Sequence, residues 1–292
     1  MNPGRKSRRL PIQPFDRRRK PRALLAWGVG LVLLLAPASP GADAPDSARS
    51  EPDELPVPGS LAGDGEVLPA VARPFGPGES LRFSVQYGII KAGTAWLEVP
   101  GAGAVDGHRV LTLVARAESN SFFSHFYKVR NRIESYWDST GHFSRRYVEN
   151  RREGNYRTDS DIRFDYERQE AVYQDGGAFP IPPGVQDALS SFYFARTQAL
   201  PLGGSVLFDY HASRKSAPLE VRVLGRDRIS TPAGTFSCVV IEPVLKAGGI
   251  FKNKGRLVIW LTDDERRMPV LMKSKVLIGS ISVVLQEART GA

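Results

Sequence analysis

The side chains of this sequence best suited to bind a metal or to act as a catalytic base are its four histidines, His108, His125, His142 and His211. A protein zinc site needs three or four converging ligands, and a helical metalloprotease site places two histidines four residues apart. The sequence contains no HxH or HExxH pattern, and only one cysteine accompanies the histidines. We therefore expect the histidines to lie on strand faces or at the surface, and we expect no metal and no cofactor.

That cysteine, Cys238, lies between Ser237 and Val239 in an apolar stretch. A nucleophilic thiol requires an adjacent base and a positively charged, accessible environment that favours the thiolate. Neither is indicated here, so we predict that Cys238 is a buried, unreactive thiol. A single cysteine also excludes an internal disulfide, so the core alone must stabilise the domain.

A pair of carboxylates, Asp159 and Asp161, could also do chemistry. Residues two apart on a strand share a face, so these two could form an acid/base couple or a calcium site. Ion pairing with Arg157 and Arg163 on the same face is the alternative that we favour. The sequence has no GxSxG, SxxK or P-loop pattern. We therefore expect no catalytic site and predict that the protein is not an enzyme.

Positive charge is concentrated at the N-terminus. The 292 residues carry a formal net charge of +9, and residues 1–22 hold nine basic side chains and one acidic side chain, Asp16. The remaining chain is therefore close to neutral and lacks the basic patch that nucleic-acid binding requires. The basic segment precedes an apolar run over residues 23–36 and then small residues. This order is typical of a secretory signal peptide.

We therefore predict a signal peptide over residues 1–38, cleaved after Ala38, and a periplasmic protein. The apolar run is shorter than the ~20 residues that span a bilayer. The alternative is an uncleaved segment that anchors the protein in the inner membrane through residues 23–36. Residues 39–73 are rich in proline, glycine and acidic residues, which predicts a disordered linker, or else a loosely docked arm. A single domain is predicted over residues 74–288, with a tail over 289–292.

Alternation of apolar and polar residues predicts strands over most of this domain. The clearest runs are residues 81–87, 94–99, 108–118, 129–137, 170–174, 206–211 and 219–229. Residues 229–285 contain four more strand-like runs, separated by turns at Thr231–Gly234, 246–249 and Asp263–Pro269. Residues 121–127 could form a helical turn or a bent strand. Charges of both signs over residues 144–165 predict a hairpin with a charged outer face, whose inner face carries Tyr147, Tyr156, Ile162 and Phe164.

One helix is predicted over residues 185–200. Leu189, Phe192, Tyr193 and Arg196 recur at helical spacing, and Asp187 lies in the first turn, where a carboxylate suits the positive end of the helix. The chain therefore has about eleven strands and one helix, with no alternation of strand and helix. This is a mainly β fold (α+β by count), in which an antiparallel sheet wraps around one helix.

Four segments of the sequence resemble the bacterial family of unknown function numbered 3108. They are YGIIKAG (Tyr87–Gly93), DALSSFY (Asp187–Tyr193), TPAGTF (Thr231–Phe236) and WLTDD (Trp260–Asp264) followed by Pro269 and Val270. The resemblance extends from about residue 75 to residue 285. It implies an exported envelope protein of Gram-negative bacteria with no established activity. It also implies an incurved antiparallel half-barrel closed by a helix, similar to periplasmic lipoprotein carriers of the LolA/LolB type, although a fold does not fix a function.

A half-barrel with an apolar inner face can enclose a ligand pocket. Arg196 could reach the rim of this pocket and meet an anionic head group, and each tryptophan could equally belong to the core. We expect a protein that binds a lipid, an acyl chain or another apolar ligand. The alternative is a scaffolding module that binds an envelope protein or peptidoglycan through the charged face between Arg145 and Arg163. The candidate lining residues are Trp96, Trp137, Leu189, Phe192, Tyr193, Arg196 and Trp260.

Overall fold

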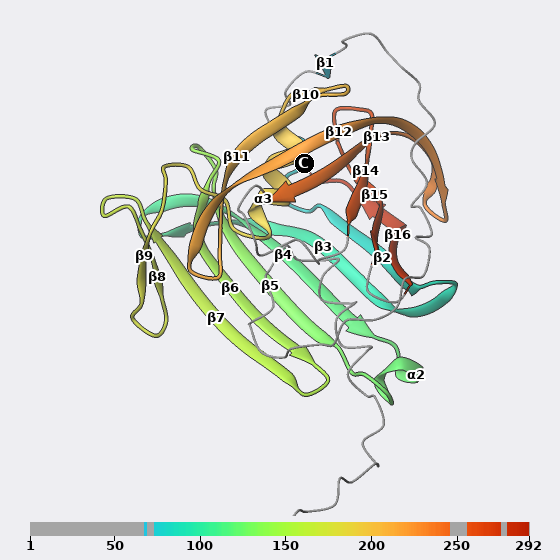
Figure 1. Ribbon diagram of the computed structural model, residues 1–292, viewed down its shortest axis with the longest axis horizontal. Helices are drawn as coiled ribbons and strands as arrows, with labels where there is room; N and C mark the ends of the chain where they lie inside the picture. The colour runs from blue at the N-terminus through green and yellow to red at the C-terminus, as the bar shows by residue number, and fades with distance from the viewer. Residues whose placement is uncertain (1–66, 69–72, 246–255, 276–278, 292) are drawn as a thin grey trace, which may run out of the picture.

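The computed structural model describes residues 67–68, 73–245, 256–275 and 279–291 (Figure 1). The predicted signal peptide, most of the predicted linker and the predicted turn at 246–249 therefore lie outside the described residues. Within the predicted linker, Val67 and Leu68 form strand β1, which pairs with strand β10 (Leu200–Pro201). At these two residues the structure corresponds to the docked arm rather than to the disordered spacer.

Fourteen strands form one antiparallel sheet in the order β11-β12-β13-β14-β15-β16-β2-β3-β4-β5-β6-β7-β8-β9. Their bounds are β2 (Ser80–Tyr87), β3 (Ile90–Val105), β4 (His108–Ser119), β5 (Arg130–Asp138), β6 (Ser144–Glu153), β7 (Tyr156–Asp165), β8 (Glu170–Tyr173), β9 (Ala178–Pro180), β11 (Ser205–Ala212), β12 (Lys215–Thr231), β13 (Gly234–Leu245), β14 (Leu257–Thr262), β15 (Pro269–Lys275) and β16 (Ser280–Arg289). Strands that are adjacent in this sheet are also neighbours in the sequence, except where β16 pairs with β2. The mainly β fold is confirmed, with more strands than the eleven predicted.

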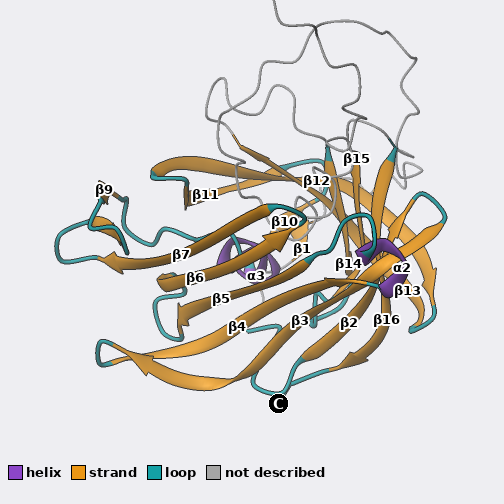
Figure 2. Cartoon of the chain, turned by 90° about the horizontal axis from the view of Figure 1, so that it is seen from below, coloured by secondary structure: helices purple, strands orange, loops and turns teal. Residues whose placement is uncertain are grey.

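The sheet curves into a half-barrel around the helix α3 (Ser190–Thr197), as Figure 2 shows. Its two outermost strands, β11 and β9, are not paired with each other in the described part of the chain, so the barrel stays open. Irregularities in the ladder add curvature, because a bulge bends a strand and increases its twist. One lies in β12 between Val223 and Gly225, where the glycine has a φ of 151°. The incurved antiparallel half-barrel is confirmed.

The main core lies on the inner face of this sheet. Leu81, Phe83 and Val85 alternate inwards along β2, and Leu189, which precedes α3, and Tyr193 of α3 pack into the same cluster. A second, smaller cluster lies on the opposite face of β13–β15 and is formed by Cys238, Val240, Val258, Trp260, Val270 and Leu271. The sheet therefore buries apolar side chains on both faces at its C-terminal half.

The charged hairpin of β6 and β7 differs from its prediction in part. Tyr147, Ile162 and Phe164 are buried on the inner face as predicted, but Tyr156 is exposed because it begins β7 directly after the turn. The inner face of β6 also carries charged residues. The side chain of Arg151 lies between the buried carboxylates of Glu149 and Glu153, with which it forms ion pairs of 3.4 and 3.0 Å.

The connection between β4 and β5, residues 120–129, contains the short helix α2 (Ser121–Ser124). The side chain of Asn120 accepts a hydrogen bond of 2.9 Å from the backbone N–H of Phe123 and so caps the turn. This resolves the segment for which the sequence left a helical turn and a bent strand open.

Helix α3 is shorter than the predicted 185–200. The backbone of Gln186 forms hydrogen bonds of 2.9 and 2.8 Å with two residues of β11, which holds the chain extended there. The carboxylate of Asp187 accepts the backbone N–H groups of Leu189 and Ser190 over 2.8 and 2.7 Å. Tertiary pairing therefore outweighs the helical periodicity of residues 185–189, and Asp187 precedes the helix instead of lying in its first turn.

Candidate functional site

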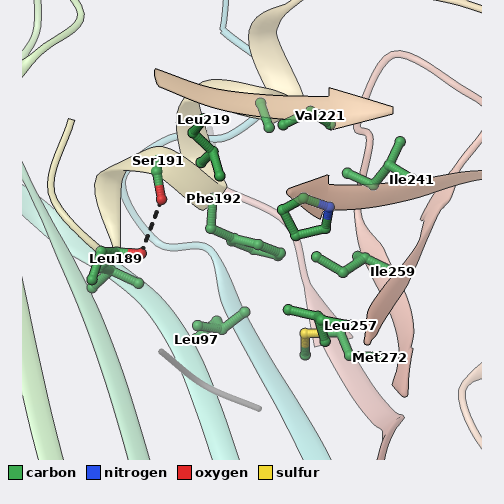
Figure 3. Close-up of a pocket in the computed structure, with 13 residues that line it drawn as sticks. Leu97, Leu189, Ser191, Phe192, Leu219, Val221, Ile241, Leu257, Ile259 and Met272 are labelled. Carbon is green, nitrogen blue, oxygen red and sulfur yellow. Dashed lines mark hydrogen bonds between the residues drawn. The ribbon is translucent and has the colours of Figure 1, made fainter. Parts of the chain in front are cut away.

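A pocket lies between α3 and the inner face of strands β12–β15 (Figure 3). Helix α3 and the residues before it form one wall, and Phe192 projects from this wall towards the strands. The opposite wall comes from alternate, inward-facing positions of four adjacent strands, and Leu97 of β3 completes the floor. The lining residues are Leu97, Ala188, Leu189, Ser191, Phe192, Ala195, Leu219, Val221, Ile241, Pro243, Leu257, Ile259 and Met272.

The pocket offers almost no polar group to a ligand. Ser191 has the one side chain in the lining that carries a hydroxyl, and this hydroxyl donates to the carbonyl oxygen of Ala188 over 3.1 Å. The cavity volume is about 40 Å³, whereas a single water needs about 10–15 Å³ on a comparable scale. An apolar cavity of this kind favours a small piece of hydrocarbon over water.

Two of the predicted site residues, Leu189 and Phe192, line this pocket. Sequence reasoning did not single out the strand residues of the opposite wall, such as Val221, Ile241 and Ile259. Part of their signal was present, because Val221 lies in a run with period two, whereas Ile241 and Ile259 lie in continuous apolar runs that are typical of a buried strand. The sequence did not show which of the two faces of each strand would turn towards the helix.

The three predicted tryptophans do not line the pocket. Trp96 lies on the outer face of β3, where the guanidinium of Arg116 lies 4.8 Å from its ring centroid. Trp137 is completely buried in the core and stacks on His142. Trp260 belongs to the smaller cluster on the opposite face of the sheet, and its indole N–H donates to Asp227 over 2.9 Å. This corrects the prediction, because strand parity sends Trp96 and Trp260 away from α3.

Tyr193 and Arg196 also lie away from the pocket. The Tyr193 ring packs edge-to-face on Phe75, with centroids 4.7 Å apart. Arg196 is completely buried instead of reaching the rim, and its two terminal nitrogens donate to the two carboxylate oxygens of Glu79 over 2.8 Å each. Arg196 therefore fixes α3 to the start of β2, and its guanidinium is paired with Glu79 instead of being placed at the rim of the pocket.

A buried carboxylate fixes the other end of α3 to the sheet. Asp187 accepts hydrogen bonds from the hydroxyls of Ser135 on β5 and Ser144 on β6, the first over 2.5 Å. Burial raises the pKa of Asp187, and these hydrogen bonds oppose that effect. The wall of the pocket that α3 forms is thus held at both of its ends by buried polar contacts.

Side chains connect the two open edges of the half-barrel. His211 on β11 is hydrogen-bonded through Nε2 to the Tyr173 hydroxyl on β8 over 3.0 Å, and through Nδ1 to Ser216 over 2.9 Å. Ser216 in turn donates to the carbonyl oxygen of Pro180 in β9 over 3.3 Å. Burial lowers the pKa of His211 to about 4. His211 therefore acts in this structure as a neutral link across the opening.

The carboxylate pair of β7 is occupied by arginines. Asp161 forms two hydrogen bonds with Arg146, and Asp159 forms two with Arg152, so the pairing runs across the β6–β7 hairpin. The predicted partners Arg157 and Arg163 are not those that the structure shows for this pair. Among the described residues, no three His, Cys, Asp or Glu side chains converge as metal ligands would. Most charges of the face between Arg145 and Arg163 are therefore matched within the protein.

Cys238 is completely buried, as predicted, and burial raises the pKa of its thiol to about 12. We expect no reaction with a charged thiol reagent at pH 8 under native conditions, because only the thiolate reacts and the sulfur is inaccessible. Reaction of one thiol per chain should follow unfolding in denaturant. Rapid native labelling, followed by absorbance of the released chromophore, would contradict this prediction.

Comparisons with known proteins agree with the fold. The model of a family described as "Protein of unknown function (DUF3108)" matches residues 82–286. Among solved structures, a beta-barrel-like protein of the domain of unknown function DUF1849 from Brucella abortus superposes with a TM-score of 0.50 and 11% sequence identity, over 76% of this chain and 100% of the other. That likeness concerns the fold alone.

Two further structures are more distant. A chain from Parabacteroides distasonis assigned as a lipoprotein has a TM-score of 0.36 and 11% identity, over 76% of this chain and 99% of that one. A chain from Bacteroides fragilis assigned as an exported protein with a YmcC-like fold has a TM-score of 0.35 and 12% identity, over 76% and 100%. No match was found among curated protein sequences. In the described part of this chain, neither helix has the length and apolar character needed to cross a membrane.

Proposed function

Because the chain belongs to the DUF3108 family of proteins of unknown function, its own geometry must suggest its role, and we propose that it binds the hydrocarbon chain of a lipid or acylated ligand. The binding site is the pocket between α3 and the inner face of β12–β15. We propose further that it does so as an exported, non-enzymatic protein of the cell envelope. The order of basic, apolar and small residues over 1–38 supports export.

The chemistry of the pocket lining carries this proposal. Twelve of the thirteen lining residues have apolar side chains, and the hydroxyl of the thirteenth, Ser191, is already hydrogen-bonded. A ligand with buried polar groups would lose its hydrogen bonds to water and gain none. A hydrocarbon chain has no hydrogen bonds to lose on entry, and it removes its own apolar surface from water. The lining therefore favours hydrocarbon over sugars, peptides and nucleotides.

The size of the pocket suggests how a longer chain is accommodated. The present cavity of about 40 Å³ holds only the end of a hydrocarbon chain, because ligand sites of 300–1,000 Å³ are usual for whole small molecules. Phe192, Pro243 and Leu257 are partly exposed and so form the accessible side of the lining. A rotation of the Phe192 side chain would extend the pocket without moving the sheet.

A charge placed in the lining tests the proposal. Leu257→Asp should weaken binding of a fluorescent long-chain fatty acid at least about tenfold, because the pocket offers no partner for a buried carboxylate. The matched control is Leu207→Asp, since Leu207 is an exposed leucine on β11 outside the lining. Titration by fluorescence would give both dissociation constants.

Equal affinities for the two variants would show that the probe binds elsewhere. Absence of binding by the unmodified protein would reject the proposed function. Native mass spectrometry of protein recovered from cells adds an independent readout, because a co-purified lipid should appear as a mass increment that Leu257→Asp loses and Leu207→Asp keeps.

A further inference from the structure

Exposed apolar side chains gather at one end of the half-barrel. Six large apolar residues of the described chain are exposed, and five of them lie in connections, or at strand ends directly beside them, at the same end of the sheet. These five are Ile89 (99% exposed), Ile90 (52%), Phe122 (62%), Phe126 (72%) and Tyr156 (40%). Scattered single apolar residues are normal on a protein surface, but a concentration of this kind indicates an interaction site.

The topology explains why these residues lie together. In a sheet of consecutive hairpins, alternate connections lie at the same end, so the β2–β3, β4–β5 and β6–β7 connections are neighbours. Figure 1 shows them along its lower right side, where α2 projects from the sheet. We call this row of three connections, residues 87–91, 119–130 and 153–157, the apolar edge.

Hydrogen bonds make the apolar edge one continuous structure. The side chain of Asn120 donates to the carbonyl oxygen of Lys91 over 2.6 Å, which links the β4–β5 connection to the β2–β3 turn. The backbone N–H of Gly154 donates to the carbonyl oxygen of Lys128 over 2.8 Å and links the β6–β7 turn to the same connection. The rings of Phe122 and Phe126 are held edge-to-face with centroids 5.5 Å apart.

The charges of the apolar edge are mainly basic. Lys91, Lys128, Arg130 and Arg157 are exposed there, whereas Glu118, beside the edge, is the one exposed carboxylate near them and lies 3.7 Å from Arg130. Of the remaining basic groups, neither Lys91 nor Lys128 has an ion-pair partner among the described residues. An exposed apolar group flanked by unpaired lysines matches a bilayer surface, where phosphate groups lie above hydrocarbon.

We propose that the apolar edge docks on the surface of a membrane that contains anionic lipids, with Ile89, Phe122 and Phe126 inserted at the interface. The side chains project from two separate connections, Ile89 from one and Phe122 and Phe126 from the other, so they fit a deformable lipid surface better than the flat complementary surface of a protein. Lysines at the same level would meet the head groups. The proposal rests on exposure and charge at the edge and does not require that the pocket binds a ligand.

The position of the pocket relative to the apolar edge suggests a purpose for membrane docking. Leu257 begins β14 and pairs with Ser274, near the end of β15. The following strand, β16, begins at Ser280, whose carbonyl oxygen accepts the backbone N–H of Gly88 in the β2–β3 turn. Leu257, a partly exposed residue of the pocket lining, therefore lies at the same end of the sheet as the apolar edge. A lipid chain that leaves a membrane beneath the edge would meet the pocket with little exposure to water.

Vesicle flotation tests the proposal with three proteins that share the same N-terminal segment. The unmodified full chain, the triple variant Ile89→Ser/Phe122→Ser/Phe126→Ser and the control Leu207→Ser are mixed with vesicles of phosphatidylcholine, with or without phosphatidylglycerol. Leu207 is the sixth exposed apolar residue and is 60% exposed, but it lies on β11, away from the edge. Any contribution of residues 23–36 to binding is common to all three proteins and cancels in the comparison.

The unmodified protein and Leu207→Ser should bind equally, and the triple variant should bind at least about tenfold more weakly, because each insertion removes apolar surface from water. Lys91→Gln/Lys128→Gln should lose about fivefold for each lysine on anionic vesicles and little on neutral ones. Both variants change exposed side chains, and an unchanged melting temperature verifies their fold. Binding by the triple variant that equals that of the unmodified protein would overturn the proposal. A second outcome would also overturn it: the unmodified protein does not bind vesicles but forms a dimer, and the triple variant is a monomer. Fatty-acid binding is measured in a separate experiment. If the unmodified protein does not bind fatty acid, the proposed function is rejected, but the proposal that the apolar edge docks on a membrane is unaffected.

Discussion

Replacement of Arg196 by methionine should lower the free energy of unfolding by about 3–5 kcal/mol, because it leaves a buried carboxylate without its partner. The side chains of Arg196 and Glu79 are 0% and 2% exposed, and they share two hydrogen bonds of 2.8 Å. Arg196 also donates to the carbonyl oxygen of Arg266 over 3.0 Å and lies 4.9 Å from the centroid of the Phe75 ring. Urea unfolding at neutral pH measures the loss.

The pair of Arg116 and Glu98 is a matched control, because it has the same two-bond geometry at 2.9 and 3.0 Å but is 34% and 25% exposed. Arg116→Met should cost no more than about 1 kcal/mol, as is usual for accessible ion pairs. The double variant Glu79→Met/Arg196→Met should be more stable than Arg196→Met alone, since it removes the orphaned charge. Similar losses for Arg196→Met and Arg116→Met would show that burial does not control the energy of this contact.

A second large effect is expected from acid. In the unfolded chain, His211 becomes protonated near the ordinary histidine pKa of 6.5, whereas burial lowers its pKa to about 4 in the folded protein. Below pH 6.5 the unfolded state therefore binds more protons than the folded state, and stability falls as the pH falls. The loss of unfolding free energy caused by His211 reaches about 3 kcal/mol near pH 4. It is absent above pH 6.5.

The hydrogen bonds of His211 explain why its charged form is disfavoured. The Tyr173 hydroxyl accepts the backbone N–H of Arg214 over 2.8 Å and can donate to Nε2 of a neutral imidazole. A protonated ring would compel that hydroxyl to accept twice, beside the guanidinium of Arg214, which lies 5.3 Å from the Tyr173 ring. Protonation thus weakens the link between the open edges of the half-barrel, although Arg214 retains its ion pair with Asp175.

The variant His211→Gln isolates this contribution. Other groups also titrate: burial raises the pKa of Asp187 and of Glu149, which favours the folded state in acid, while burial lowers the pKa of His142 and adds to the loss. These contributions are common to both proteins. Urea unfolding between pH 7 and pH 4 should therefore show a steeper loss for the unmodified protein than for His211→Gln. Parallel curves would contradict the assignment to His211, whatever the difference in absolute stability.

The sequence by itself determined which segments form strands and where several of them turn. Alternation depends only on whether neighbouring side chains are apolar, so β2, β5, β11 and much of β12 were predicted closely. The turns at Thr231–Gly234 and Asp263–Pro269 were also predicted, because glycine, proline and aspartate favour turns locally. The four family segments extended this to the half-barrel around one helix, and two of the candidate lining residues, Leu189 and Phe192, lie at its pocket.

Only the tertiary structure decided which face of each strand meets the helix and which distant groups become partners. Trp96 and Leu97 are adjacent, yet one lies beneath Arg116 outside and the other lines the pocket, because side chains alternate across a strand. Arg196 finds Glu79 across 117 residues, a pairing that no local pattern contains. The apolar edge likewise combines three turns that are separated in the sequence and become neighbours when the sheet forms. Local propensity acts between near neighbours, whereas the site, the buried ion pair and the proposed docking surface depend on contacts that arise once the sheet has curved.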